Sequence, residues 1–240
     1  MSKKLHALIV SLFFLQSFLF AGGFPAAYYQ IDDTAEQKEE FIRQMKVLAD
    51  KSNEEILKDR EFVTQFFAKA VPYAFRGLNE QNVGYLINLR NKYRIQNLFD
   101  REAYYDRIDT VPVSLTIAQA ALESGWGKSR FAREANNLFG HWNYSGTGLV
   151  SKNTAVAPNQ MIRIFGSLQK SVNGYMLNLN THNAYADFRA KRVKARQQGK
   201  AYSGIDAAKT MVHYSELKGE YIKMVQEMIR DNNLQGLDVN

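Results

Sequence analysis

Large apolar residues recur at intervals of three and four along most of the chain, which is the period of an amphipathic helix. Residues 34–71 follow this pattern with one interruption at Asn53. We therefore predict two helices in this segment, the second with Asn53 as its N-cap and ending before Pro72. The same period in residues 79–93 predicts a third helix.

The next strongly apolar segment follows Pro112. Residues 115–123 are rich in Ala, Leu and Ile, so a helix here would be apolar on most of its faces and is expected to be buried. Pro112 suits the first turn of that helix, and Gly125 supplies a C-terminal stop. A short helix over residues 128–135 and a tight turn over residues 136–140 are expected to follow.

Two runs of β-prone residues, 148–156 and 160–165, lie among Gly, Asn and Pro and predict a single hairpin. Helical periodicity returns from Ser167 and continues almost to the C-terminus. The predicted fold class is therefore mainly α (α+β), with a small β-hairpin lobe.

A domain boundary is predicted near residues 94–105, between the first helices and the buried helix. Residues 23–104 would form an N-terminal helical lead-in, and residues 105–240 would form the main domain. Packing of the lead-in helices on the main domain is the expected arrangement.

The N-terminus has the layout of a secretory signal peptide. Lys3 and Lys4 precede an apolar run over residues 8–21, and small residues follow. The run is shorter than the roughly 20 residues needed to span a bilayer, which favours cleavage over the alternative, an uncleaved membrane anchor. We predict a signal peptide over residues 1–22 and export to the periplasm, the cell envelope or the exterior.

The formal net charge is +7, and loss of Lys3 and Lys4 with the leader would leave about +5. This charge suits a polyanionic partner, and export favours an envelope polymer with carboxylates and phosphates over nucleic acid. Residues 189–200 contain six basic side chains and no acidic one. This run predicts either a grip on such a polymer or a solvated helix face.

The chain contains no cysteine, so neither disulfides nor thiolate metal sites hold it together. Its four histidines lack zinc spacing such as H-E-x-x-H, and we predict no metal and no cofactor. Gly127-Lys128-Ser129 imitates the end of a phosphate-binding loop, but Leu122 stands where that loop requires its first glycine. This excludes nucleotide binding by such a loop.

Glu123 stands at the end of the predicted buried helix, beside Gly125 and Trp126. The negative end of the helix dipole and apolar surroundings both disfavour a carboxylate there, so its pKa is expected to be raised. A general acid that protonates a glycosidic oxygen near neutral pH needs such a pKa, and Trp126 offers a flat face for a sugar ring. The alternative is that Glu123 caps the helix or forms a surface ion pair with a basic residue such as Lys128 or Arg130.

Residues 121–132, ALESGWGKSRFA, and residues 136–140, NNLFG, resemble the signature of bacterial glucosaminidase domains in autolysins and flagellar peptidoglycan hydrolases. Within that family the chain resembles the bacterial Bax proteins over roughly residues 34–234. The resemblance implies a lysozyme-like helical domain that hydrolyses the β-1,4 bond on the reducing side of N-acetylglucosamine. It also implies peptidoglycan glycan strands as the partner, and it leaves the oligomeric state open.

The resemblance makes Glu123 the general acid and places Tyr214 of HYSEL at the cleft. A tyrosine packed with its hydroxyl satisfied is the alternative for Tyr214. The residues predicted to contact the sugar are Trp126, Asn137, Phe139, Trp142 and Tyr214.

A second carboxylate, expected in such domains in the hairpin lobe, is missing: no Asp or Glu occurs between Glu134 and Asp187. A two-carboxylate mechanism cannot be built from that lobe. The second group could be Asp109, Glu216 or Glu220, or the acetamido group of the substrate. A weak or inactive peptidoglycan-binding protein and a lytic transglycosylase are the alternative functions.

Overall fold

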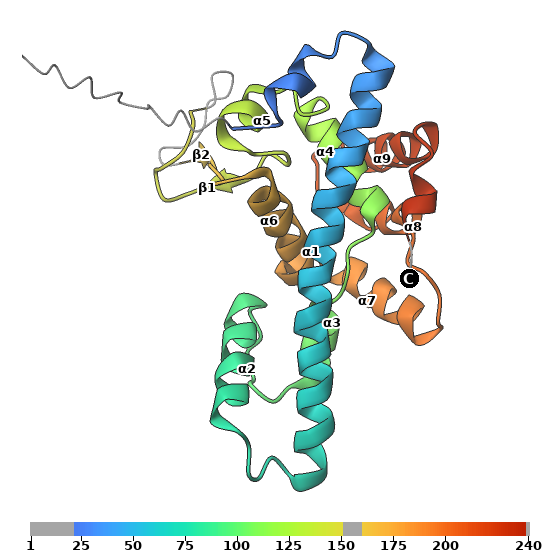
Figure 1. Cartoon of the computed structure of the whole chain (residues 1–240). Coiled ribbons are helices and arrows are strands. Elements are labelled where there is room, and N and C mark those ends of the chain that lie inside the picture. Colours follow the sequence, from blue (N-terminus) through green and yellow to red (C-terminus); the bar gives the residue numbers. More distant parts are fainter. Residues whose placement is uncertain (1–21, 151–159, 239–240) are drawn as a thin grey trace, which may run out of the picture.

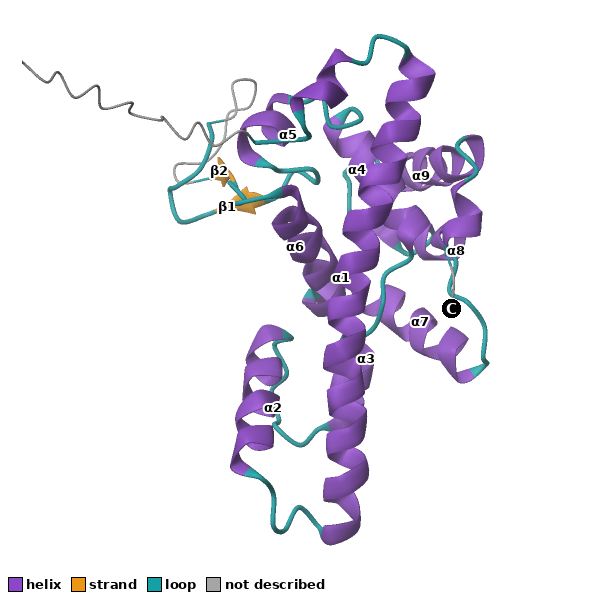
Figure 2. Ribbon diagram, in the orientation of Figure 1, coloured by secondary structure: helices purple, strands orange, loops and turns teal. Residues whose placement is uncertain are grey.

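The computed structural model describes residues 22–150 and 160–238. In this part of the chain the protein is mainly helical with one small antiparallel hairpin, which confirms the predicted fold class (Figure 2). The α-helices are α1 (Thr34–Ala70), α2 (Glu80–Lys92), α3 (Arg101–Arg107), α4 (Val113–Ser124), α5 (Arg130–Ala135), α6 (Leu168–Thr181), α7 (Ala186–Gln197), α8 (Gly204–Ala208) and α9 (Gly219–Asp231). The 3₁₀ turns are η1 (Ala26–Gln30), η2 (Val71–Tyr73), η3 (Asn183–Tyr185), η4 (Met211–His213) and η5 (Leu234–Leu237), and the strands are β1 (Trp142–Asn143) and β2 (Met161–Ile162).

Helix α1 is the long axis of the molecule (Figure 1). It continues without a break through Asn53, so the predicted division into two helices is wrong. The amide of Asn53 does not cap a helix. It donates to the carbonyl oxygen of Val111 at 2.9 Å and accepts from the Val111 N–H at 3.0 Å. This tertiary contact uses the polar groups that would otherwise favour a helix start, and it ties the middle of α1 to the segment that leads into α4.

The C-terminal half of α1 lies beside α2 at one end of the molecule (Figure 1). Asp59 of α1 is buried and accepts three hydrogen bonds: from Tyr85 at 2.9 Å, from Lys92 at 2.6 Å and from Tyr93 at 2.9 Å. A buried carboxylate is tolerated when donors and a cation surround it in this way. Asp59 therefore links the two helices.

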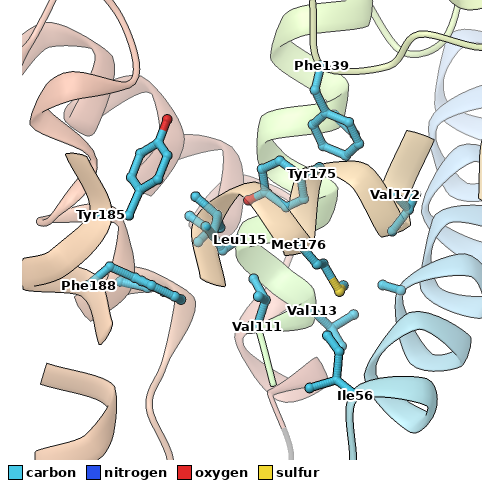
Figure 3. Packing of buried hydrophobic residues seen from close by; sticks show 14 of the residues in the cluster. Ile56, Val111, Val113, Leu115, Phe139, Val172, Tyr175, Met176, Tyr185 and Phe188 are labelled. Atoms are coloured by element: carbon cyan, nitrogen blue, oxygen red, sulfur yellow. The ribbon is translucent and has the colours of Figure 1, made fainter. Parts of the chain in front are cut away.

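Helix α4 runs through the core between α1 on one side and α8 and α9 on the other. Nearly all of its residues are buried, as its apolar composition predicts. Its first turn is capped from the far end of the chain, because the Asp238 carboxylate accepts from the Ser114 N–H at 2.9 Å and the Ser114 hydroxyl at 2.6 Å. Figure 3 shows the buried side chains around this helix, with Phe139 over Tyr175 of α6.

Part of the basic run of α7 is buried in the protein. Neither the predicted polymer-binding site nor the predicted solvated helix face anticipated this. Arg189 and Arg192 are buried at 3% exposure and donate to carbonyl oxygens that include those of Leu179 and Asp109. Arg196 forms an ion pair with the Asp109 carboxylate. Long guanidinium forks suit this work because each reaches several acceptors at once. At least three of the six basic side chains therefore have partners within the protein and are not free to bind a polyanion.

The hairpin is shorter than predicted. Strand β1 pairs with β2 through Trp142 opposite Ile162, and Leu149 forms an isolated bridge with Ile162. The first strand therefore begins before the predicted run 148–156, part of which lies outside the described residues.

The predicted signal peptide falls almost entirely outside the described residues. The segment that follows it is folded onto the body: Phe24 and Tyr28 are buried, and their rings lie 4.7 Å apart. No helix in the described part of the chain is long and apolar enough to cross a membrane.

Candidate active site

The site is built on the tight turn that ends α4. Gly125 terminates the helix in the left-handed region at φ 56°, and Gly127 is left-handed at φ 73°. The buried Ser124 hydroxyl accepts from the Gly127 N–H at 2.7 Å and donates to the Ala120 carbonyl at 2.6 Å. A Cβ on Gly127 would lie 2.4 Å from the Phe24 ring. The Ser and Gly residues of ESGWG thus shape the turn that places Glu123.

Glu123 reaches solvent from the last turn of α4. Its Oε1 accepts a hydrogen bond of 2.8 Å from the Tyr221 hydroxyl of α9. Desolvation raises the pKa of Glu123, and the Tyr221 hydrogen bond opposes that rise in part. The direction predicted from the sequence is therefore confirmed. No ion pair of Glu123 with Lys128 or Arg130 is found among the described residues.

Four tyrosines from different parts of the chain form a cluster near this carboxyl group, and one of them, Tyr221, contacts it. Burial is the main cause that raises the pKa of each hydroxyl, to about 12 for Tyr185, and the negative charge of Glu123 adds to each rise. They are Tyr175 of α6, Tyr185 of η3, Tyr214 after η4 and Tyr221 of α9. All four stay neutral near neutral pH, so Glu123 faces phenol groups rather than charges.

Tyr214, which the sequence resemblance placed at the cleft, packs on Tyr221, the residue that donates to Glu123. Its ring stacks on Tyr221 with a centroid distance of 5.3 Å and an interplanar angle of 12°. Its hydroxyl is buried, and among the described residues it has no hydrogen-bond partner. The packed ring agrees with the alternative, its hydroxyl has no partner among the described residues, and contact of Tyr214 with substrate stays a prediction.

The Trp126 ring packs on α1. Its ring meets Phe41 edge to face at 5.4 Å, and the Lys38 ammonium lies 5.1 Å from its centroid. The Tyr28 hydroxyl donates to the Trp126 carbonyl oxygen. Contact of Trp126 with a sugar ring stays a prediction, and the visible contacts of its side chain are with the lead-in helix.

Asn137 and Phe139 of the NNLFG turn are buried and have partners within the protein. The Asn137 amide donates to the carbonyl oxygens of His141 and Arg163 at 2.8 and 2.9 Å, and its oxygen accepts from the His141 N–H at 3.0 Å. Phe139 stacks on Tyr175 with centroids 4.0 Å apart. Asn137 therefore holds the base of the hairpin and Phe139 packs on Tyr175 of α6, while sugar contact by either stays a prediction.

Trp142 is half-buried in β1 opposite Ile162. Its predicted contact with substrate is not tested by any feature of this strand. The neighbouring Tyr144 is the more exposed aromatic side chain of the lobe, at 72%, and sequence reasoning did not single it out.

The sequence offered three carboxylates as a second catalytic group. Asp109 is fully buried, is paired with Arg196 and Arg60, and precedes α4, whose stretch from Val113 to Glu123 alone extends about 15 Å at 1.5 Å per residue. It therefore cannot face the same bond as Glu123, since paired glycosidase carboxylates lie within about 10 Å of each other. Glu216 and Glu220 are exposed, and Glu220 pairs with Lys223.

No group of three or more potential metal ligands occurs in the described ranges. The tyrosines around Glu123 other than Tyr214 were missed in the sequence. They lie at ordinary apolar positions of helices, and only the folded chain brings residues 119, 175 and 221 together.

A family model described as mannosyl-glycoprotein endo-beta-N-acetylglucosaminidase matches residues 100–234. Protein bax of Escherichia coli (strain K12) is 34% identical over 127 residues, which is 53% of this chain and 45% of that protein. Exo-glucosaminidase LytG of Bacillus subtilis (strain 168) is 56% identical over 43 residues, 18% of this chain and 15% of LytG.

These two matches span less than half the length of either relative. No solved structure matches. The family match, in contrast, takes in more than half of the chain and includes the ESGWG turn, the NNLFG turn and the four tyrosines. The chain therefore belongs to the glucosaminidase family.

Proposed function

We propose that this protein is an exported peptidoglycan hydrolase, an endo-β-N-acetylglucosaminidase with Glu123 as its general acid. The observation that carries the proposal is the Glu123 carboxyl group, which is open to solvent, has a raised pKa and ends the family's ESGWG turn. The relative LytG is an exo-glucosaminidase, which supports the same bond type. The predicted leader agrees with a substrate outside the cytoplasm.

In the proposed reaction, protonated Glu123 gives its proton to the glycosidic oxygen while the bond to the anomeric carbon breaks. The acetamido oxygen of the same sugar attacks that carbon from the other face and forms a cyclic intermediate. Water then opens the ring and gives its proton to the Glu123 carboxylate. This route needs no carboxylate in the hairpin, which has none in its sequence.

Tyr214 is proposed to bind the substrate through its hydroxyl, which lacks a partner among the described residues. A small outward rotation of the ring would present one donor and one acceptor to the sugar beside Glu123. The rival route uses Glu216 or Glu220 as the second carboxylate. Retained activity in Glu216→Gln and Glu220→Gln supports the acetamido route, and loss in either supports the rival.

Digestion of purified sacculi, followed by mass spectrometry of the soluble fragments, tests the function. The proposal predicts fragments with reducing N-acetylglucosamine ends. Anhydro-muramic ends would instead identify a lytic transglycosylase. The lack of a hairpin carboxylate favours one further candidate, a protein that binds glycan without cutting it. That candidate predicts co-sedimentation with sacculi and no released fragments.

A further inference from the structure

A chain of hydrogen bonds leads from the core to Glu123. The Tyr175 hydroxyl is 2.5 Å from Gln119 Oε1, Gln119 Nε2 is 2.9 Å from the Tyr221 hydroxyl, and that hydroxyl is 2.8 Å from Glu123 Oε1. Tyr175 and Gln119 are fully buried, and Tyr221 is 4% exposed. Gln119 and Glu123 are one turn apart on α4, so both side chains face α9.

The chemistry of each group gives this chain a direction. The amide oxygen of Gln119 can only accept, so Tyr175 donates to it, and the amide nitrogen can only donate, so the Tyr221 oxygen accepts from it. The Tyr221 hydroxyl has a single proton, which is then left for Glu123. If the oxygen and nitrogen of the Gln119 amide exchanged places, the Tyr221 hydroxyl would donate its proton to Gln119. Its oxygen lone pair would then face the Glu123 carboxylate, which is repulsive.

The two oxygens of Glu123 are consequently different. Oε1 accepts from Tyr221, while Oε2 has no hydrogen-bond partner among the described residues. A proton on Oε1 would have to displace the Tyr221 hydrogen, whereas a proton on Oε2 displaces nothing.

We propose that Tyr221, oriented by Tyr175 through Gln119, is a positioning residue that keeps the acid proton of Glu123 on Oε2, the oxygen presented to substrate. The catalytic consequence rests on the proposed function, but the location of the proton does not. Stacking of Tyr214 on Tyr221 at an interplanar angle of 12° restrains the ring that carries the donating hydroxyl.

The groups near Glu123 do not change their own charge in the pH range in which Glu123 titrates. The tyrosines of α6, η3 and α9 and the one after η4 remain neutral near neutral pH, because burial raises the pKa of each. The nearby acid of α9, Glu220, is exposed and paired with Lys223. A change in the Glu123 midpoint therefore reports on its own hydrogen bond.

The test is a carbon-13 NMR titration of the Glu123 carboxyl group in the full chain, with its signal assigned by its loss in Glu123→Gln. Tyr221→Phe should raise the midpoint by about one pH unit, the equivalent of one hydrogen bond to a charged group. Gln119→Leu should raise it less, because the freed Tyr221 hydroxyl can still donate part of the time. The control is Tyr104→Phe, a buried tyrosine of α3 whose hydroxyl bonds the Leu86 carbonyl, and it should leave the midpoint unchanged.

Thermal unfolding establishes that each variant is folded, and Tyr175→Phe replaces Gln119→Leu if that variant is not. The alkaline limb of kcat/KM against pH should move up with the NMR midpoint in Tyr221→Phe, with a lower kcat and an unchanged KM. An unchanged Glu123 midpoint in folded Tyr221→Phe overturns the proposal. A shift in Tyr221→Phe without any shift in the Gln119 or Tyr175 variant overturns the relay. A shifted midpoint in a protein that releases no glycan fragments upholds the proton's location and refutes the proposed function instead.

Discussion

At the scale of single residues, Glu123 combines two properties that usually exclude each other. It reaches solvent, yet its surroundings raise its pKa. The sequence revealed this residue because an acid at the end of an apolar helix stands out and because ESGWG is a distinctive motif. Tyr221 and Gln119 gave no such signal, since a tyrosine and a glutamine on helices are common and their contact joins α4 to α9.

The raised pKa of Glu123 predicts how stability depends on pH. A carboxyl group whose folded pKa exceeds its unfolded value favours the folded state when it is protonated. That contribution is complete below the unfolded pKa and is lost as the pH rises through the folded pKa. Glu123→Gln, which stays neutral, should therefore be more stable than the wild type at neutral pH and equally stable in acid. Urea unfolding at several pH values measures this, and an equal gap at every pH would contradict it.

Tyr214 offers a second prediction at this scale. Because its hydroxyl has no partner among the described residues, Tyr214→Phe removes a polar group without breaking a hydrogen bond. Stability should stay the same or rise slightly. The kcat/KM on soluble glycan should fall roughly fivefold to tenfold, the worth of one hydrogen bond to substrate. Lower stability with full activity would show that the hydroxyl serves the fold instead.

At the scale of elements, the local pattern predicted what local chemistry decides. Helix α4, its stop at Gly125 and the helix predicted over residues 79–93 follow from residues within each segment. The continuity of α1 does not, because the partner of Asn53 is Val111, in another segment. The buried arginines of α7 were missed for the same reason. The sequence of a basic run is the same whether its side chains donate to water or to carbonyl groups of distant segments.

The link between α1 and α2 can be tested through Asp59. Asp59→Asn keeps the shape but removes the charge that three donors share. The free energy of unfolding should fall by about 1–3 kcal/mol, as measured by urea denaturation. Asp50→Asn, in an exposed pair with Lys46, should change it by less than about 0.5 kcal/mol. Equal effects of the two substitutions would argue against a special role of Asp59.

At the scale of the whole molecule, the lead-in and the main body share one hydrophobic cluster that runs from Phe24 to Leu234. The described residues after the predicted leader pack on the turn that places Glu123, and α1 packs on α4 and α6. The predicted domain boundary near residues 94–105 therefore stays a prediction. The lead-in packs on the main body, as predicted.

The N-terminal segment should accordingly stabilise the whole fold. Phe24→Ala would empty the space between Tyr28, Phe41 and Gly127, and we expect a loss of about 3–5 kcal/mol in thermal or urea unfolding. Tyr144→Ala, at a side chain that is 72% exposed, should cost less than about 0.5 kcal/mol. An unchanged free energy of unfolding in Phe24→Ala would show that this segment does not stabilise the fold.

The most direct measurement for the whole account is the rate at which Glu123→Gln releases fragments from purified sacculi. The matched control is Glu102→Gln, an exposed glutamate on α3 that pairs with Arg101. Removal of the acid proton should lower the rate roughly 10²-fold to 10⁴-fold, while binding to sacculi and the control rate stay at the wild-type level. Wild-type turnover in Glu123→Gln would contradict the assignment of Glu123 as the general acid.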